Sequence, residues 1–287
     1  MTLSIGLFDL VPGKVLLGGY KLVAARRETG MSQAYEVLDQ ETGMPMELSI
    51  FPAGLFEDAE QGKAFADKLG AWTGLDISGL PALMQSIPLT DGGVALLGAL
   101  VTGESLRSRQ KSGDGPLEIE DATDLGRRLL GALIDLHARD LVHGDVKPAS
   151  IWIDGGTSTA MLTDGGVTGA LWEAKHLGTR TALIGTPYYA PIEQFSGDAP
   201  TQASDQYNVG TVLYEALTGV LPWQGSGYIE VFQSKMEPGA PSMRLRNRDV
   251  EIPSEIETAI ARSLRAKSSE RYASCADFLA ALDAAVE

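Results

Sequence analysis

The chain has 287 residues, of which 44% are hydrophobic, 7% aromatic and 21% charged, a composition that excludes a disordered or collagen-like protein. Lys and Arg total 23 against 38 Asp and Glu, and the resulting net charge of −15 disfavours nucleic acid and anionic lipid as partners. Cys275 is the only cysteine, which excludes an internal disulfide framework and a cysteine-rich zinc site.

The sequence predicts no direct membrane insertion of this chain. Its longest apolar stretch, 92–101, is much shorter than the roughly 20 residues of a membrane-spanning helix. The first ten residues contain an acidic residue and no basic one, which is not the pattern of a secretory signal. We therefore expect a cytoplasmic protein, or the cytosolic part of a longer membrane protein.

The first third of the chain predicts a small antiparallel sheet. Extended runs at 20–23, 34–38 and 46–51 are separated by turns that contain glycine. In 57–75 the apolar residues have helical spacing, so we expect one helix that packs against this sheet. A further strand is predicted at 94–101.

The rest of the chain predicts a mostly helical part. Apolar residues recur at the helical period in four segments, 125–137, 209–217, 256–264 and 278–282. A stretch rich in loops, 142–202, separates the first two of these segments. A sheet-rich lobe followed by a helical lobe predicts a ligand cleft at their junction.

The most specific motif is VHGDVKPAS at 142–150. Six other motifs accompany it along the chain: GESL at 103–106, LTDGG at 162–166, GTPYYAPIEQ at 185–194, SDQYNVG at 204–210, LTGVLPW at 217–223 and KSSER at 267–271. From about residue 20 to the C-terminus, the chain resembles the protein-kinase family in these motifs and their order. The resemblance is strongest to the bacterial Ser/Thr kinases, whose catalytic loop reads H-R-D-x-K-P-x-N.

The resemblance implies an α+β class and a bilobal protein-kinase-like fold. It has a small N-lobe, made of an antiparallel sheet with one main helix, and a larger, mostly helical C-lobe. We expect an N-terminal extension over 1–18, the N-lobe over 19–98, the hinge over 99–102 and the C-lobe over 103–287.

The residues that would grip the nucleotide phosphates depart from the family pattern. The first two glycines of the family's phosphate-covering loop fall on Arg27 and Thr29, and Gly30 remains. An ordinary turn is as good an interpretation of Gly30 as a phosphate contact. The family lysine that binds two phosphates aligns with Ser49, and its glutamate partner aligns with Lys68.

The adenine slot contains two bulky or charged replacements. Glu47 aligns with the small residue above the base, and Trp152 with the aliphatic residue below it. Glu47 and Ser49 share a strand face and should both point into the cleft. Lys68 would then pair with Glu47; alternatively, Glu47 bends to solvent and Lys68 lies on the helix surface. Trp152 either fills the slot or is an ordinary core aromatic.

The hinge region also departs from the pattern. Gly98 aligns with the bulky residue that normally stands beside the hinge, and the hinge itself includes Leu100. The glycine would leave room behind the adenine position.

Part of the catalytic apparatus is kept. By resemblance, Asp145 aligns with the catalytic base, Lys147 with the lysine that steadies the transferred phosphate, and Asp164 with the magnesium aspartate. The second metal ligand is Ser150 instead of asparagine, and Gly165 replaces the phenylalanine of the metal-binding loop. These residues are either vestigial or weakly active.

Other family positions are structural or regulatory. Glu193 and Arg271 match a buried ion pair, and Asp205 matches an aspartate that caps a helix and holds the catalytic loop, which His143 also braces. The family arginine of that loop is Gly144, so three candidate phosphorylation sites lose their charged receiver: Thr179, Thr181 and Thr186.

The leading hypothesis is a pseudokinase with a degraded ATP site that regulates or scaffolds through protein partners. It predicts no cofactor, no nucleic acid partner and no phosphate transfer. The alternative is an atypical Ser/Thr kinase or other ATP-dependent transferase with Mg²⁺, in which Arg26, Arg27 or Lys68 replaces the missing lysine. A ligand sensor that binds a nucleotide or another metabolite without turnover is a third possibility.

Overall fold

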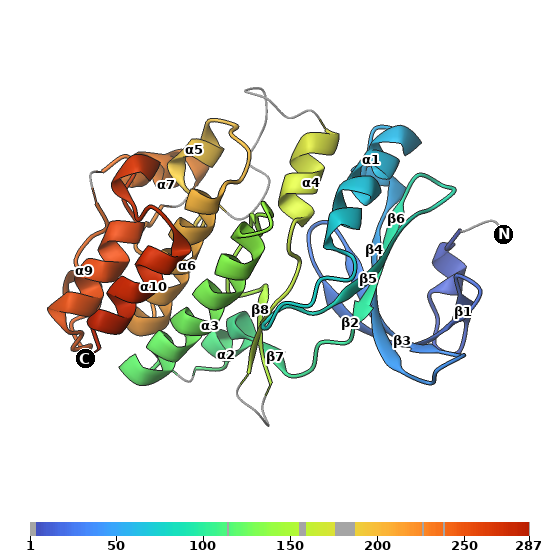
Figure 1. Cartoon of the computed structure of the whole chain (residues 1–287), viewed down its shortest axis with the longest axis horizontal. Coiled ribbons are helices and arrows are strands. Elements are labelled where there is room, and N and C mark those ends of the chain that lie inside the picture. Colours follow the sequence, from blue (N-terminus) through green and yellow to red (C-terminus); the bar gives the residue numbers. More distant parts are fainter. Residues whose placement is uncertain are drawn as a thin grey trace. The chain divides into compact units, whose positions relative to one another are not determined.

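The computed structural model describes residues 4–113, 115–154, 159–175, 187–225, 227–237 and 239–286. The chain divides into two compact units. The first consists of Met1–Asp76, Pro81–Val101 and Ala170–His176; the second consists of Ile77–Leu80, Thr102–Gly169 and Leu177–Glu287. Figure 1 labels their helices and strands.

The first unit is built on a six-stranded sheet in which every neighbouring pair is antiparallel. In spatial order its strands are β1 (Val15–Leu16), β2 (Tyr20–Glu28), β3 (Gln33–Asp39), β4 (Pro45–Phe51), β6 (Val94–Ala99) and β5 (Leu83–Pro88). The strands predicted at 34–38 and 46–51 match β3 and β4. β1 and β5 were not predicted, because β1 has only two residues and LMQSIP in β5 lacks a clear alternation.

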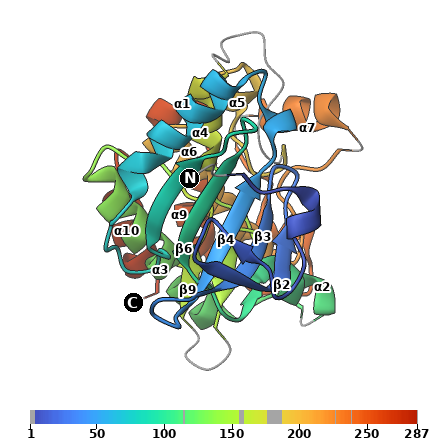
Figure 2. The same cartoon turned by 90° about the vertical axis from the view of Figure 1, so that its right-hand side faces the viewer.

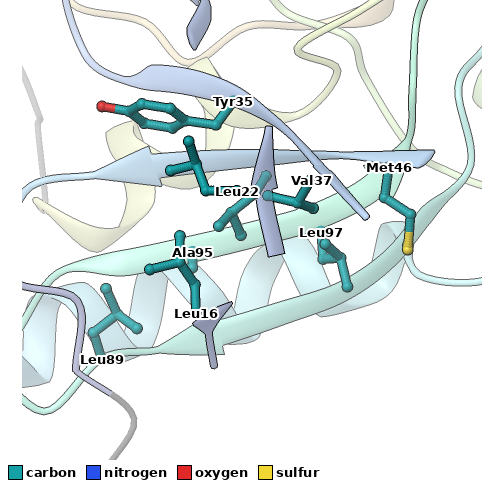
Figure 3. Packing of buried hydrophobic residues seen from close by; sticks show 9 residues of the cluster. Leu16, Leu22, Tyr35, Val37, Met46, Leu89, Ala95 and Leu97 are labelled. Atoms are coloured by element: carbon teal, nitrogen blue, oxygen red, sulfur yellow. The ribbon is translucent and has the colours of Figure 1, made fainter. Parts of the chain in front are cut away.

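One face of this sheet carries the hydrophobic core of the first unit (Figure 3). Leu22, Val37 and Met46 lie opposite one another on β2, β3 and β4. The residues that flank them in each strand face the other way, as the two-residue period of a strand requires. The N-terminal segment, with η1 (Leu7–Asp9) and β1, covers this core with partly buried residues that include Ile5 and Leu10 (Figure 2).

The helix α1 (Ala59–Leu69) packs on the same unit. Asp58 caps its N-terminus by accepting a hydrogen bond from the Gln61 backbone N–H at 2.8 Å. Phe65 is fully buried and its ring lies 5.0 Å from that of Phe51. The helix is shorter than the 57–75 predicted, because the chain tightens into η3 (Gly70–Trp72) and then turns. The short helix η2 (Ala53–Leu55) precedes it.

The second unit is mostly helical. Its helices are α2 (Leu106–Ser112), α3 (Ile119–His137), α5 (Ile192–Phe195), α6 (Gln202–Thr218), α7 (Tyr228–Lys235), α8 (Met243–Arg246), α9 (Ser254–Ser263), η4 (Ser268–Glu270) and α10 (Cys275–Ala284). α6 is buried along almost its whole length and packs against α3 and α9, while α10 packs against α3 and α9 (Figure 1). α3, α6, α9 and α10 confirm the four segments with helical periodicity.

The loop-rich stretch 142–202 contains short elements that periodicity could not predict. β8 (Ile151–Ile153) and β9 (Ala160–Leu162) form a small antiparallel sheet with β7 (Glu104–Ser105). α4 (Val167–Ala174) begins in the second unit and ends in the first. Strands of two or three residues are too short to reveal an alternation. Among the described residues, no helix is long and apolar enough to cross a membrane.

Candidate nucleotide-binding and catalytic residues

Glu47 forms an ion pair with Arg27 on the sheet of the first unit. Arg27 Nη2 and Nε lie 2.8 and 3.3 Å from Glu47 Oε1, and the two side chains are only 13% and 11% exposed. Arg27 lies opposite Ala34 on β3, which lies opposite Ser49 on β4, so these residues share the sheet face that is turned away from the hydrophobic core. The glutamate is therefore neutralised within its own sheet.

Lys68 does not pair with Glu47. Its Nζ contacts the carboxylate of Glu173 on α4, and both side chains are about half exposed. The expectation that Lys68 would neutralise Glu47 is wrong, because the Glu47 carboxylate is paired with Arg27 of the same sheet. The alternative that Glu47 bends out to solvent is also wrong, since the residue is only 9% exposed.

Arg26 reaches the hinge. Its Nη2 donates a hydrogen bond to the Val101 carbonyl oxygen at 2.9 Å, and its Nη1 lies 3.8 Å from Glu36 Oε2 on β3. A register shift between Ala25 and Arg27 makes Arg26 the extra residue of a β-bulge. Such a bulge changes the direction of side chains, so two consecutive arginines both reach partners outside β2.

The turn between β2 and β3 satisfies its own backbone donors. The Thr29 hydroxyl oxygen accepts hydrogen bonds from the backbone N–H groups of Met31 at 3.1 Å and Ser32 at 2.9 Å. A phosphate-binding loop needs such N–H groups to point at its ligand. A Cβ added at Gly30 would meet nothing within 4 Å, so this glycine is not required by a close approach within the chain.

Gly98 does not leave free space beside the hinge. A Cβ at this position would lie 2.8 Å from the Ala82 carbonyl oxygen, closer than real side chains approach a backbone atom. The expected room behind the adenine position is therefore absent on this side, because the backbone at Ala82 occupies it. Leu100, which follows β6, is partly buried.

In the second unit, the loop after α3 is held together by its own polar groups. Lys147 Nζ forms an ion pair with the Asp145 carboxylate. The Ser150 hydroxyl accepts from the Lys147 backbone N–H at 3.1 Å and lies 3.0 Å from the Lys147 carbonyl oxygen, to which it can donate. Ser150 is 1% exposed, so its hydroxyl serves to close this loop.

Asp205 holds the backbone of the same loop. Its Oδ2 and Oδ1 accept from the backbone N–H groups of His143 at 2.9 Å and Gly144 at 2.8 Å, and its Oδ2 lies 2.9 Å from His137 Nε2. From the sequence, Asp205 was expected to cap a helix, but it is not the N-cap of α6. Thr201 is the N-cap, since its hydroxyl accepts from the Ser204 backbone N–H. The carboxylate of Asp205 is engaged by the loop instead.

His143 links this loop to the segment that carries Asp164. The Asp145 backbone N–H donates to His143 Nδ1 at 3.3 Å, so Nε2 carries the ring hydrogen and donates to the Thr163 carbonyl oxygen at 2.9 Å. Asp164 has a φ of +65°, a conformation that is uncommon for a residue other than glycine and that marks strained functional positions.

The described residues do not assemble a group of three or more His, Cys, Asp or Glu side chains that could hold a metal ion. Ser150, at the position of the second metal ligand, has its hydroxyl within the loop's own hydrogen bonds. Ser49 carries no charge for a phosphate.

The remaining predicted positions are placed as follows. Arg271 Nη1 and Nη2 bind the two carboxylate oxygens of Glu193 at 2.7 and 2.9 Å, so the structure forms the pair that the motifs suggested. Trp152 lies on β8, partly buried, and its indole Nε1 is buried without a hydrogen-bond partner in the described part of the chain. Thr179, Thr181 and Thr186 lie outside the described residues.

The second unit contains a cavity of about 650 Å³ that the sequence analysis missed. Lys147, Tyr188, Tyr189, Glu215 and Trp223 are among its lining residues. The Tyr189 hydroxyl donates to Glu215 Oε2 at 2.6 Å, and burial together with this carboxylate raises the pKa of Tyr189 above its usual value. One feature of the sequence could have indicated this cavity: Glu215 is the only charged residue in the run VGTVLYEALT, which forms part of a buried helix.

Comparisons with known proteins identify the family. The model of the protein kinase domain matches residues 84–282, which is more than half of the chain, so the chain belongs to the protein kinase family. Its relatives include bacterial Ser/Thr kinases. PknA of Mycobacterium tuberculosis is 30% identical over 277 residues, which cover 95% of this chain and 62% of PknA. PrkC of Bacillus subtilis is 25% identical over 96% of this chain and 42% of PrkC.

The fold is also that of a solved kinase domain. The crystal structure of the Mycobacterium tuberculosis PknI kinase domain has a TM-score of 0.76 to this chain at 18% identity, and covers 96% of this chain and 99% of that domain. This similarity confirms the predicted protein-kinase fold, with an antiparallel-sheet N-lobe and a helical C-lobe. The chain spans less than two thirds of the length of the relatives PknA and PrkC.

Proposed function

We propose that this chain is a catalytically impaired member of the kinase family, a pseudokinase that acts by binding protein partners. The observation that carries the proposal is the Arg27–Glu47 ion pair beside Ser49. In a kinase a lysine at the position of Ser49, held by a glutamate at the position of Lys68, binds the nucleotide phosphates. Here the lysine is replaced by Ser49, and Arg27, the nearby cation, is paired with a carboxylate.

A second line of support comes from the loop that carries Asp145. Phosphoryl transfer requires metal ions that neutralise the developing charge, together with a carboxylate that accepts the substrate proton. Asp145 is paired with Lys147, and the Ser150 hydroxyl is used inside the loop. Phosphate gripping and metal binding are separate requirements, so the loss of both is not repaired by one substitute residue.

The second unit supports the proposed role in protein binding. This unit keeps the contacts of Asp205 with the catalytic loop and the Glu193–Arg271 pair, although the groups for phosphate chemistry are altered. Its cavity combines the aromatic rings of Tyr188, Tyr189 and Trp223 with the buried Glu215 carboxylate. Tyrosine and tryptophan are enriched among the residues that contribute most of the binding energy in protein interfaces. We propose an extended polypeptide segment as the occupant.

The alternative of an atypical transferase keeps specific support. Asp145, Lys147 and Asp164 are all present, and Arg27 lies on the same sheet face as Ser49. A transferase would have to separate Arg27 from Glu47 during its cycle.

A direct test measures phosphate incorporation. The purified chain is incubated with ATP labelled at the γ-phosphate, with Mg²⁺ or Mn²⁺, and with a general protein substrate such as casein. We expect incorporation no greater than that of the matched Asp145→Asn variant. Incorporation that depends on Asp145 would contradict the proposal and support the transferase. PknA, 30% identical to this chain, is the positive control.

A further inference from the structure

A pocket of about 610 Å³ lies in the second unit between α2 and the end of α6, and we call it the α2 pocket. Two hydrogen bonds hold its walls together. The Leu117 backbone N–H donates to the Ala216 carbonyl oxygen at 2.7 Å, and the Asn247 side-chain N–H donates to the Thr218 carbonyl oxygen at 2.7 Å. Both carbonyl groups belong to the last turn of α6, whose carbonyl groups need partners from outside the helix.

The charge of the α2 pocket is opposite to that of the chain. Arg107, Arg109 and Lys111 of α2 line it, and Glu215 is the one acidic side chain among its described lining residues. The chain as a whole has a net charge of −15. Salt screens exposed charges beyond about 8–10 Å, so the three nearby cations determine which ligand charge the pocket attracts.

Two of these three cations already bind carboxylates of the chain. Arg109 Nε lies 3.2 Å from Glu104 Oε1, and Arg107 Nη1 lies 3.7 Å from Glu215 Oε1. Lys111 is exposed and has no ion-pair partner among the described residues. Lys111 is therefore the cation that is available for a carboxylate of a ligand.

Gln110 lies between these cations on α2, and its side chain also lacks partners. It lines the α2 pocket, and its Nε2 and Oε1 are both buried without a hydrogen-bond partner in the part of the chain that the structure describes. Such groups cost free energy and are rare in native structures. A carboxamide offers donors and an acceptor together, so the backbone amide of a peptide complements it at both atoms.

We propose that the α2 pocket binds an acidic segment of a partner polypeptide. The Gln110 side chain turns toward the segment and pairs with one of its backbone amides, and Lys111 pairs with an adjacent Asp or Glu side chain of the segment. The inference rests on the proposed role in protein binding and assigns a charge to the partner.

The position of the α2 pocket favours a polypeptide over a small carboxylate. Arg107, Glu215, Gly219 and Val220 line both this pocket and the cavity that contains Tyr189 and Trp223. An extended chain advances by about 3.3 Å per residue, so a few residues suffice to pass from one hollow to the other beside the Arg107–Glu215 pair.

The test measures the binding of short, fluorescently labelled peptides to the whole chain by fluorescence anisotropy. The probes have blocked termini and alternate alanine with glutamate, with glutamine or with lysine. We expect the glutamate probe to bind at least about tenfold more tightly than the other two probes, which corresponds to about 1.4 kcal/mol. Its affinity should fall as salt is added, because the attraction to the cations is screened.

A lysine variant tests the charge. Lys111→Gln removes a cation at an exposed position and is expected to weaken binding of the glutamate probe by about three- to fivefold. Lys267→Gln is the matched control, because Lys267 is also an exposed lysine of the second unit but does not line the α2 pocket. It is expected to bind the probe as the unmodified chain does.

A glutamine variant tests the amide. Gln110→Leu removes the carboxamide at a similar side-chain volume and is expected to weaken binding of the glutamate probe by about tenfold. In urea unfolding its midpoint should be unchanged or higher, because a buried amide without partners is replaced by an apolar group. A residue with a structural role would respond in the opposite way, so a clear loss of stability would contradict the role of Gln110 in binding.

The outcomes separate this inference from the proposed function. Equal binding of the three probes would contradict the α2 pocket as an acidic-peptide site. Unchanged affinity in both Lys111→Gln and Gln110→Leu would do the same, since these residues line this pocket and not the neighbouring cavity. Displacement of the glutamate probe by equally low concentrations of free glutamate would show that the occupant is a small carboxylate, which also overturns the inference. In each case the pseudokinase proposal still stands; Asp145-dependent phosphate transfer, measured separately, would contradict that proposal alone.

Discussion

Lys235 Nζ donates a hydrogen bond to the Ala190 carbonyl oxygen at 2.7 Å, from a position that is only 1% exposed. The same nitrogen donates to the Tyr188 carbonyl oxygen at 2.8 Å and lies 4.9 Å from the centre of the Tyr207 ring. Lys235 on α7 therefore fixes the segment that follows the undescribed residues 176–186 and that lines the cavity of the second unit.

This burial predicts how stability changes with pH. Desolvation lowers the pKa of Lys235 well below its usual value. In the unfolded chain the lysine keeps its proton up to about pH 10.4, whereas the folded chain releases it at lower pH. Between these two values the unfolded state binds more protons, so the free energy of unfolding rises with pH, by at most about 1.4 kcal/mol per pH unit.

The measurement is urea unfolding of the unmodified chain and of Lys235→Met between pH 7 and 10. We expect a rise in stability with pH for the unmodified chain and a flatter profile for the variant. The variant should also be less stable throughout, because two buried carbonyl groups lose their donor at a cost of about 1–3 kcal/mol each. Parallel profiles for the two proteins would show that Lys235 stays charged when folded.

At higher pH, buried tyrosines reverse this trend. Burial raises the pKa of Tyr214 to about 12, and its hydroxyl donates to the Pro241 carbonyl oxygen at 3.0 Å. An unfolded tyrosine ionises near pH 10, so the unfolded state binds fewer protons than the folded state between about 10 and 12. Stability is therefore expected to fall as pH rises through this window. In Tyr214→Phe the fall should be shallower; an unchanged slope would assign the effect to other tyrosines.

The Glu193–Arg271 pair predicts a large loss of stability on truncation. The Arg271 side chain is fully buried and binds both oxygens of a carboxylate 78 residues away in the sequence. Removing one partner of such a pair costs about 3–5 kcal/mol, so Arg271→Met should lower the free energy of unfolding by about that amount. Arg128→Met is the control, since its pair with Asp124 is half exposed and worth less than about 1 kcal/mol. Similar losses in the two variants would contradict the assignment.

The sequence predicted the roles of residues that lie in motifs. It did not predict ion-pair partners that are brought together only by the folded structure. The Glu193–Arg271 pair and the engagement of Asp205 with the catalytic loop were predicted from the motif order and its resemblance to the kinase family. The partner of Glu47 could not be found this way. Arg27 reaches it through the sheet register and a β-bulge, neither of which a single sequence reveals. By analogy with the family, Lys68 was the expected partner of Glu47. Lys68 instead forms an ion pair with Glu173 on α4, a helix that periodicity did not predict.

Two glycines show the same limit of prediction from the sequence, because their neighbours in space are known only from the structure. From the sequence, Gly98 departs from the family pattern and was interpreted as added space, whereas Gly30 is the loop glycine that remains and was interpreted as a turn or a phosphate contact. The structure distinguishes the two glycines by their surroundings: the backbone at Ala82 fills the space beside Gly98, whereas the space beside Gly30 is open.

This difference gives a matched pair of substitutions in the first unit. In Gly98→Ala the new methyl group would lie 2.8 Å from the Ala82 carbonyl oxygen, so the backbone of one of the two segments must move. Overpacking of this kind typically costs about 1–3 kcal/mol, and we expect a loss of that size in urea unfolding. Gly30→Ala adds a methyl group that meets nothing within 4 Å, at a position without a positive φ. It should leave the chain as stable as before or more stable by about 0.4–1 kcal/mol, because it restricts the unfolded state. A Gly98→Ala variant as stable as Gly30→Ala would show that space does exist beside the hinge, as the sequence alone suggested.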